Sequence, residues 1–248
     1  MANEPNPLPE LPAQVSRVLH EFIAAAQAAL STDLKSIVLF GSAAEGRLRA
    51  TSDVNLLLVL SNFEPAHAAE LRRPLRIAQA AIRLSPMFVL EAELPSAITA
   101  FAEKFADILR RRRVLYGPDP CIDVKIPRAV LAARLGQVLL NLILRLREAY
   151  VMRGLREEQL ALVVADTAGP LRSTAASLLE LQGTTVKSGK EALETFINQA
   201  SNKEWHEVSQ RLSEARETGL LPSGVADTTL RQLIDIANAL RSAVGQLR

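Results

Sequence analysis

The sequence predicts an α+β protein in which a small domain with a mixed sheet is followed by an all-α helical bundle. Two apolar runs, 37–40 and 54–60, lie before residue 120, and short apolar runs bounded by turn residues are typical of buried strands. After Pro127 the apolar residues recur at helical spacing instead. Between the two regions, residues 115–120 contain one glycine and two prolines, which indicates a break in regular structure.

Domain boundaries follow from these patterns. We expect residues 1–12, which contain four prolines, to form a loose leader, residues 13–120 to form the mixed-sheet domain, and residues 121–248 to form the bundle. The first ten residues lack the basic segment and apolar core of a secretory signal. No apolar run reaches the ~18 residues of a membrane span. We therefore expect a cytoplasmic protein without a membrane partner.

Composition and charge exclude several classes of function. The 248 residues are 48% hydrophobic and 23% charged, as in ordinary soluble proteins. Lysine and arginine number 29 against 27 acidic residues, which argues against a protein held on nucleic acid mainly by phosphate contacts. The single cysteine, Cys121, excludes an internal disulfide and a multi-cysteine zinc site. The oligomeric state stays open, with a homo-oligomer among the options.

Helices and one further strand complete the first domain. Apolar spacing predicts a helix over 12–30, before the first strand, and another over 66–84, interrupted at Pro74, which has no backbone N–H to donate. Residues 86–94 are the third strand candidate, and residues 96–113 repeat the helical pattern.

The second domain is helical throughout. Two Ser-x-x-Glu sequences predict helix N-termini, because serine and glutamate at this spacing bond reciprocally to free backbone amides. A proline is favoured in the first turn of a helix, which places a further start at Pro170. The expected helices span 128–154, 155–168, 170–183, two stretches beginning at the serines of 188–191 and 201–204, and 225–247.

A turn between the first two strands is the first candidate site. Gly41 lacks a Cβ, so its backbone can turn sharply and approach a ligand. Ser42 supplies a hydroxyl and an amide where a short helix would begin, a position that favours anions. The turn is therefore predicted to be a phosphate cradle. At the start of the second strand, Asp53 and Asn55 point to the same side, where two carboxylates would share a divalent cation.

This arrangement resembles the nucleotidyltransferase superfamily, which includes DNA polymerase beta and the aminoglycoside nucleotidyltransferases. The resemblance rests on Leu39–Arg47 and on Ser52-Asp53 between two apolar strands. It implies that Gly41, Ser42 and Arg47 bind the triphosphate of an NTP, and that residues 53 and 55 hold Mg²⁺ or Mn²⁺. Where the family carries its second metal-binding acid, however, this chain has Asn55, which offers a carbonyl oxygen without charge.

The family usually takes a third carboxylate from a later strand, where it acts as base or completes the metal site. Glu91 or Glu93 could fill this role, and the alternative is that both are solvated residues at a strand end. Arg110–Arg113 leave a similar choice: arginines at a helix C-terminus suit the helix dipole, and they could also contact nucleotide phosphates.

Two functions from different classes follow. The first is a metal-dependent transferase that moves a nucleoside monophosphate from an NTP to a hydroxyl of a small molecule or protein, with weakly held Mg²⁺ or Mn²⁺. Asp53 would hold the metal, Asn55 would assist through its carbonyl, and Glu91 or Glu93 would be the base. The alternative is a catalytically degenerate module that binds a nucleotide or a partner. Whether a glutamate lies within metal-bridging distance of Asp53 and Asn55 discriminates between them.

Overall fold

The computed structural model describes residues 11–48 and 52–247. The chain divides into two compact units, residues 1–125 and 126–248, at a point five residues beyond the boundary expected from the sequence. Ten of the twelve residues of the expected leader lie outside the described residues.

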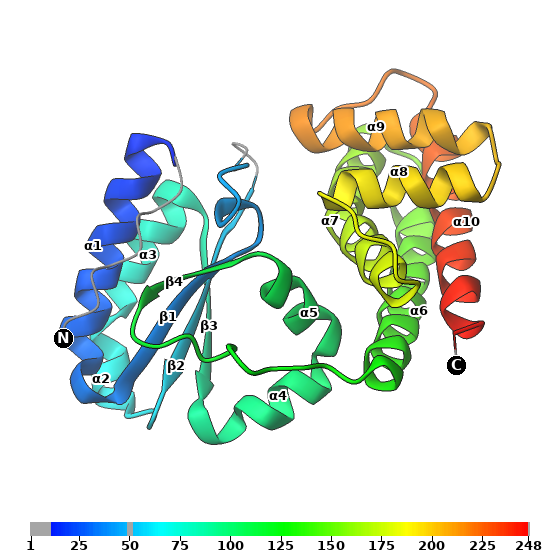
Figure 1. Ribbon diagram of the computed structural model, residues 1–248. Coiled ribbons are helices and arrows are strands. Elements are labelled where there is room, and N and C mark those ends of the chain that lie inside the picture. Colours follow the sequence, from blue (N-terminus) through cyan, green and yellow to red (C-terminus); the bar gives the residue numbers. More distant parts are fainter. Residues whose placement is uncertain (1–10, 49–51, 248) are drawn as a thin grey trace. The chain divides into compact units, whose positions relative to one another are not determined.

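The first unit is built on a four-stranded mixed sheet (Figure 1). Its spatial order is β3-β2-β1-β4. Strand β1 runs antiparallel to both β2 and β4, whereas β2 and β3 are parallel. The mixed sheet confirms the predicted fold class. The strands span Leu34–Phe40 (β1), Val54–Leu60 (β2), Leu84–Leu90 (β3) and Arg112–Tyr116 (β4).

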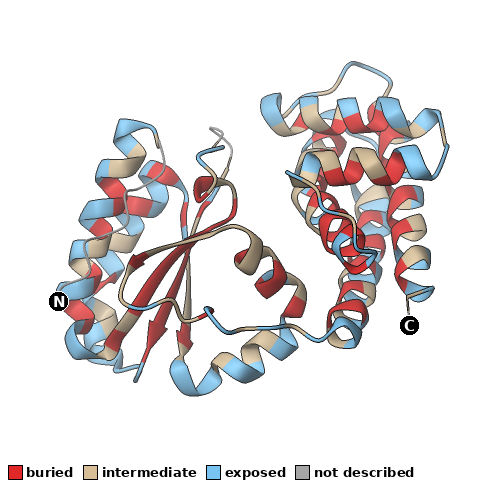
Figure 2. Cartoon of the chain, in the orientation of Figure 1, coloured by how far each residue is buried: buried red, intermediate tan, exposed pale blue. Residues whose placement is uncertain are grey.

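Helices α1 (Ala13–Leu30) and α3 (Arg72–Ile82) cover one face of the sheet (Figure 1). The core on this face takes alternate residues of β2, namely Val54, Leu56, Leu58 and Leu60, together with the apolar side of α1. Figure 2 shows these buried positions along the central strands. Because side chains alternate across a strand, Asn55 and the other odd-numbered residues of β2 face the opposite side.

The opposite face carries α5 (Ala102–Arg110), which follows the short helix α4 (Leu94–Ala100). Ala102, Phe105 and Ile108 of α5 are fully buried. Lys104 lies with its Nζ 5.7 Å from the ring centroid of Phe40, the last residue of β1. Helix α5 therefore borders the end of the sheet at which β1 finishes. Three short 3-10 turns, Ser31–Asp33, Gly41–Ala43 and Glu91–Glu93, complete the unit with helix α2 (Pro65–Glu70).

Two elements of this unit differ from expectation. The helix predicted over 66–84 is interrupted at Leu71, and Pro74 lies in the first turn of α3, where its missing N–H has no intrahelical partner to lose. The helix predicted over 96–113 is interrupted at Phe101, between α4 and α5, and ends at Arg110, after which the chain enters β4. Strand β4 satisfies the backbone groups on the second edge of β1, a tertiary requirement that outweighs the helical pattern.

The second unit is a helical bundle, and its described residues contain no strand. Helix α7 packs against α6, α8, α9 and α10, and α6 also packs against α10. One helix of the described chain, α6, is long and apolar enough to cross a membrane by length and composition. Seven of its 26 residues are buried. The helices span Arg128–Arg153 (α6), Glu157–Leu181 (α7), Gly189–Gln199 (α8), Glu204–Thr218 (α9) and Ala226–Gly245 (α10).

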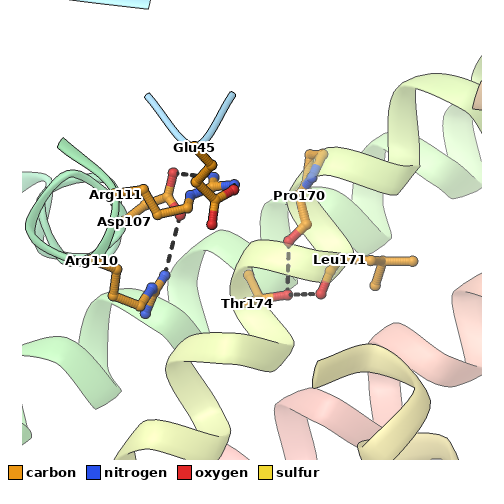
Figure 3. A network of polar contacts seen from close by, with 7 residues as sticks. All are labelled: Glu45, Asp107, Arg110, Arg111, Pro170, Leu171 and Thr174. Carbon is orange, nitrogen blue, oxygen red and sulfur yellow. Dashed lines mark hydrogen bonds and ion pairs between the residues drawn. The ribbon is translucent and has the colours of Figure 1, made fainter. Parts of the chain in front are cut away.

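Helix α7 is continuous where two helices were expected, and Pro170 lies inside it rather than at a new start. Downstream of the proline, Thr174 Oγ1 donates to the carbonyl oxygens of Pro170 (2.9 Å) and Leu171 (3.0 Å) (Figure 3). The loss of one backbone donor is small beside the burial of fifteen residues of α7, so the helix continues.

Of the two expected capping boxes, one forms at the helix start. Ser188 Oγ accepts a hydrogen bond from the amide of Glu191 at 3.2 Å, and α8 begins one residue after the serine. At the second, Ser201 adopts φ +54° and α9 begins only at Glu204. There the side chain of Asn202 accepts from the amide of Glu204 at 3.1 Å, so asparagine replaces serine as the local acceptor.

Candidate functional site

The turn after β1 brings together the three residues predicted to contact a triphosphate. Gly41 adopts φ +77°, a conformation that favours glycine, and a Cβ there would lie 3.6 Å from Asn55 Nδ2. Its amide donates to the carbonyl oxygen of Arg111 at 3.0 Å. The carbonyl oxygen of the half-buried Ser42 accepts from the amide of Arg47 at 2.9 Å, so Ser42 and Arg47 close the same turn.

Arginine side chains from the segment after α5 fix this turn in place. Arg111 donates to Asp107 and, at 3.4 Å, to Glu45 of the turn (Figure 3). Burial disfavours the charged guanidinium, but the two carboxylates outweigh it and raise the pKa of Arg111 above its ordinary value. Arg113 Nε donates to the carbonyl oxygen of Ala44 at 2.9 Å. Arg111 is the C-cap residue of α5, where its amide donates to the carbonyl oxygens of Asp107 and Ile108, whereas Arg113 lies in β4. Both side chains contact the segment around the Gly-Ser turn.

The next residue, Arg112, forms hydrogen bonds with residues that follow β4. Its Nε donates to Asp119 Oδ2 at 3.0 Å, and its Nη2 donates to the carbonyl oxygen of Cys121 at 3.3 Å. The amide of Cys121 donates in turn to Asp119 Oδ1 at 2.9 Å. Burial and the neighbouring Asp119 raise the pKa of the Cys121 thiol. This contact set anchors the chain between β4 and the second unit.

Asp53 and Asn55 lie at the end of the sheet that carries the Gly-Ser turn. Asn55 of β2 pairs with Phe40 of β1, and its Nδ2 donates to the backbone carbonyl oxygen of Asp53 at 3.3 Å. Among residues 11–48 and 52–247, the carboxylate of Asp53 is not grouped with a second acid. Its Oδ1 accepts from Arg83 Nε at 2.8 Å in an ion pair whose two side chains are both about half exposed (51% for Asp53 and 59% for Arg83).

The structure does not bring Glu91 or Glu93 to this end of the sheet. Strands β2 and β3 run parallel and in register from Val54–Leu84 to Leu60–Leu90, so the glutamates follow the far end of β3, about 20 Å away at ~3.3 Å per residue. Glu93 Oε2 accepts from the amide of Leu90 at 3.0 Å and caps its own turn. The expected grouping of a glutamate with Asp53 therefore does not occur.

The residue of β3 that pairs with Asn55 is Ser85. Paired residues of parallel strands point to the same face, so a carboxylate from β3 would need to stand at this position to join Asp53. The segment beside the start of β2 is Leu84-Ser85-Pro86, which contains no acid. Among the described residues at the starts of β2 and β3, this face thus carries one carboxylate, one amide and one hydroxyl.

These donors do not fit the magnesium site that the resemblance implies. Mg²⁺ prefers carboxylate and phosphate oxygens, and a two-metal site needs carboxylates that bridge the ions. Here the one carboxylate, Asp53, is paired with a guanidinium, and Asn55 turns its amide nitrogen to a backbone oxygen. Across residues 11–48 and 52–247, no three His, Cys, Asp or Glu side chains are grouped so as to hold a metal ion.

Comparisons with known proteins identify the fold. No family model matches the sequence, and no curated protein matches it either. The structure is similar to the crystal structure of spectinomycin adenyltransferase AAD(9) from Enterococcus faecialis with ATP and spectinomycin, with a TM-score of 0.63 and 14% sequence identity. The match covers 90% of this chain and 99% of that one. The chain therefore has the nucleotidyltransferase fold, with a mixed-sheet domain followed by a helical region.

Sequence reasoning missed two residues of this site, Arg83 and Ser85. Arg83 is the C-cap of α3 and adopts φ +53°, where glycine is the usual residue. Neither residue belongs to a motif. A usable signal was the helical segment between the second and third strands, because a helical crossover makes two neighbouring strands parallel and sets their starts side by side.

Proposed function

We propose that this protein is a nucleotide-binding module of the nucleotidyltransferase fold that does not carry out metal-dependent nucleotidyl transfer. One observation carries the proposal: the sheet end that would hold the catalytic metals presents Asp53 in an ion pair with Arg83, flanked by Asn55 and Ser85. The transferase hypothesis expected a third acid, Glu91 or Glu93, at this point, and both glutamates follow the opposite end of β3.

The phosphate-binding part of the site has the features that the proposal needs. Gly41 keeps its positive φ and has no Cβ, and its amide already donates to the carbonyl oxygen of Arg111. Arg111 and Arg113 hold the turn through Glu45 and Ala44, so the turn is preorganised before any ligand arrives. A backbone cradle depends on turn geometry more than on carboxylates, so nucleotide binding does not require the missing acids. The bound nucleotide of the similar adenyltransferase supports ATP as the first ligand to test.

Without carboxylates that bridge the metal ions, the rate of nucleotidyl transfer should fall much more than the affinity for a nucleotide. In nucleotidyl transfer, two metal ions stabilise the attacking and leaving oxygens. Losing several kcal/mol of this stabilisation slows the reaction by orders of magnitude, at about 1.4 kcal/mol per factor of ten. Binding of the phosphates, which relies on backbone amides and cations, loses much less.

Calorimetry with ATP and a pyrophosphate-release assay test the two halves of the proposal. We expect ATP to bind, and no pyrophosphate to form above the blank with Mg²⁺ or Mn²⁺ and an acceptor pool that includes spectinomycin, other small alcohols and proteins. Ser42→Trp should abolish ATP binding by filling the turn. The matched control is Asn62→Trp, an exposed loop position beyond the far end of β2.

Two results would overturn the proposal. Pyrophosphate release that disappears in Asp53→Ala would establish a working transferase. Equal ATP affinity in wild type, Ser42→Trp and Asn62→Trp, with circular dichroism showing all three folded, would remove the Gly-Ser turn as a nucleotide site.

A further inference from the structure

We infer that Arg83 takes the place of the divalent cation, so that this site binds the triphosphate of a nucleotide free of metal. The inference rests on the proposed nucleotide binding and names the group that neutralises the phosphates. Arg83 Nε lies 2.8 Å from Asp53 Oδ1, the carboxylate that the resemblance assigns to the metal. A fixed positive charge is therefore built into the position that a cation would occupy.

The backbone places Arg83 at the end of the sheet where β2 begins. Arg83 ends α3 with φ +53° and ψ +42°, and its amide donates to the carbonyls of Ala78 and Gln79. Its own carbonyl accepts from the amide of Val54 at 3.2 Å, which ties it to the start of β2. A non-glycine residue in this conformation costs about 1 kcal/mol. An arginine at a position where glycine would be more stable points to a role for its side chain.

The guanidinium retains donors for a phosphate. Arginine has five N–H donors, and among the described residues Asp53 contacts Arg83 only through Nε. The terminal nitrogens belong to a side chain that is 59% exposed, and arginine binds phosphate oxygens in a bidentate manner. A triphosphate arriving at the Gly41 turn can therefore engage Arg83 and displace Asp53, a weak and exposed partner.

A second cation stands at the same end of the sheet. Lys104 Nζ lies over the ring of Phe40, which immediately precedes Gly41 and pairs with Asn55. Arg83 and Lys104 thus add two positive charges beside Asp53, and at the adjacent turn Arg111 is paired with the carboxylates of Asp107 and Glu45. This balance favours a free polyanion, whereas a metal-complexed one brings its own cations into a site that already holds them.

Calorimetry with ATP, in EDTA and in excess Mg²⁺, tests the inference. Wild type should bind ATP in EDTA and bind it more weakly in Mg²⁺, which removes free triphosphate. Arg83→Gly should weaken binding in EDTA by at least about tenfold, the value of one charge-assisted hydrogen bond. Glycine suits the positive φ, so this variant should remain folded. Arg76→Ala is the control, because it removes an exposed arginine from the same helix.

For Asp53→Asn, the two hypotheses predict opposite changes in ATP affinity. If Asp53 held a metal, this change would weaken binding of the Mg²⁺ complex. If Arg83 is the cation, the change releases its guanidinium and tightens binding of free ATP by up to about fivefold. ATP binding that requires Mg²⁺, or that is unchanged in Arg83→Gly, would overturn the inference while leaving nucleotide binding intact. No ATP binding under either condition would instead defeat the proposed function itself.

Discussion

Replacing Asn55 by aspartate restores the paired acids that the fold's metal site is expected to carry, and the structure sets the size of the effect. Positions 53 and 55 are two strand residues apart, about 6.6 Å between Cα atoms. Two unit charges at that separation repel by about 0.6 kcal/mol at the dielectric of water and about 2.5 kcal/mol at an effective dielectric of 20. Asp53 is half exposed, so we expect a loss of about 1 kcal/mol in unfolding free energy.

The loss of unfolding free energy caused by Asn55→Asp should depend on Arg83, so the change is made both in the wild-type protein and in Arg83→Gly. With Arg83 present, its guanidinium offsets one of the two charges, so the loss should be smaller and added Mg²⁺ should not restore it. In Arg83→Gly the repulsion is unshielded, and the paired carboxylates are available to a cation. There we expect Asn55→Asp to lower Tm in EDTA by roughly 3–5 °C and millimolar Mg²⁺ to recover most of the difference.

Differential scanning fluorimetry of the four proteins, with and without Mg²⁺, measures the coupling between positions 55 and 83 as a double-mutant cycle. Asn62→Asp adds the same charge at an exposed loop position and serves as the control. The reasoning is refuted if Mg²⁺ stabilises wild type as much as the double variant, because Asp53 would then hold a metal without a second acid. It is equally refuted if the four proteins respond identically.

Three further predictions concern the surroundings of the site. Gly117→Ala should destabilise the first unit by more than 2 kcal/mol in urea denaturation, because φ is +72° and a Cβ would overlap the carbonyl oxygen of Lys35. Arg111→Met should cost roughly 1–3 kcal/mol of unfolding free energy in urea denaturation, because it leaves two part-buried carboxylates without their guanidinium. Cys121, buried and with a raised pKa, should react with a thiol reagent at pH 8 far more slowly in the native protein than in urea.

Local patterns in the sequence predicted the parts of the fold that depend on local physics. The apolar runs at 37–40 and 54–60 became β1 and β2, and the Gly41-Ser42 turn lies between them with its positive φ at the glycine. The capping serine at 188 begins α8 because one side-chain oxygen and one amide suffice to define that start. Each of these features is decided within a few residues of chain.

Features that depend on contacts between residues far apart in the sequence were not predicted from local patterns. Strand β4 forms because β1 has a second edge to satisfy, and nothing within 112–116 announces that partner. Arg83 meets Asp53 across thirty positions of sequence. The placement of Glu91 and Glu93 could have been inferred, since a helical crossover makes β2 and β3 parallel and puts their C-terminal ends at the far edge.

The departures from a metal site support one another, and this mutual consistency favours a binding module over an enzyme with one weakened ligand. With Asn55 alone, a single metal could still be held by Asp53 and the phosphates of an NTP. Arg83 competes with a metal for the carboxylate of Asp53, and Ser85 leaves no acid on β3 to replace it. One guanidinium beside two carboxylates would leave a net negative charge that repels phosphate. With the amide at position 55, the charges of Asp53 and Arg83 balance, and Lys104 adds a positive charge at the same end of the sheet.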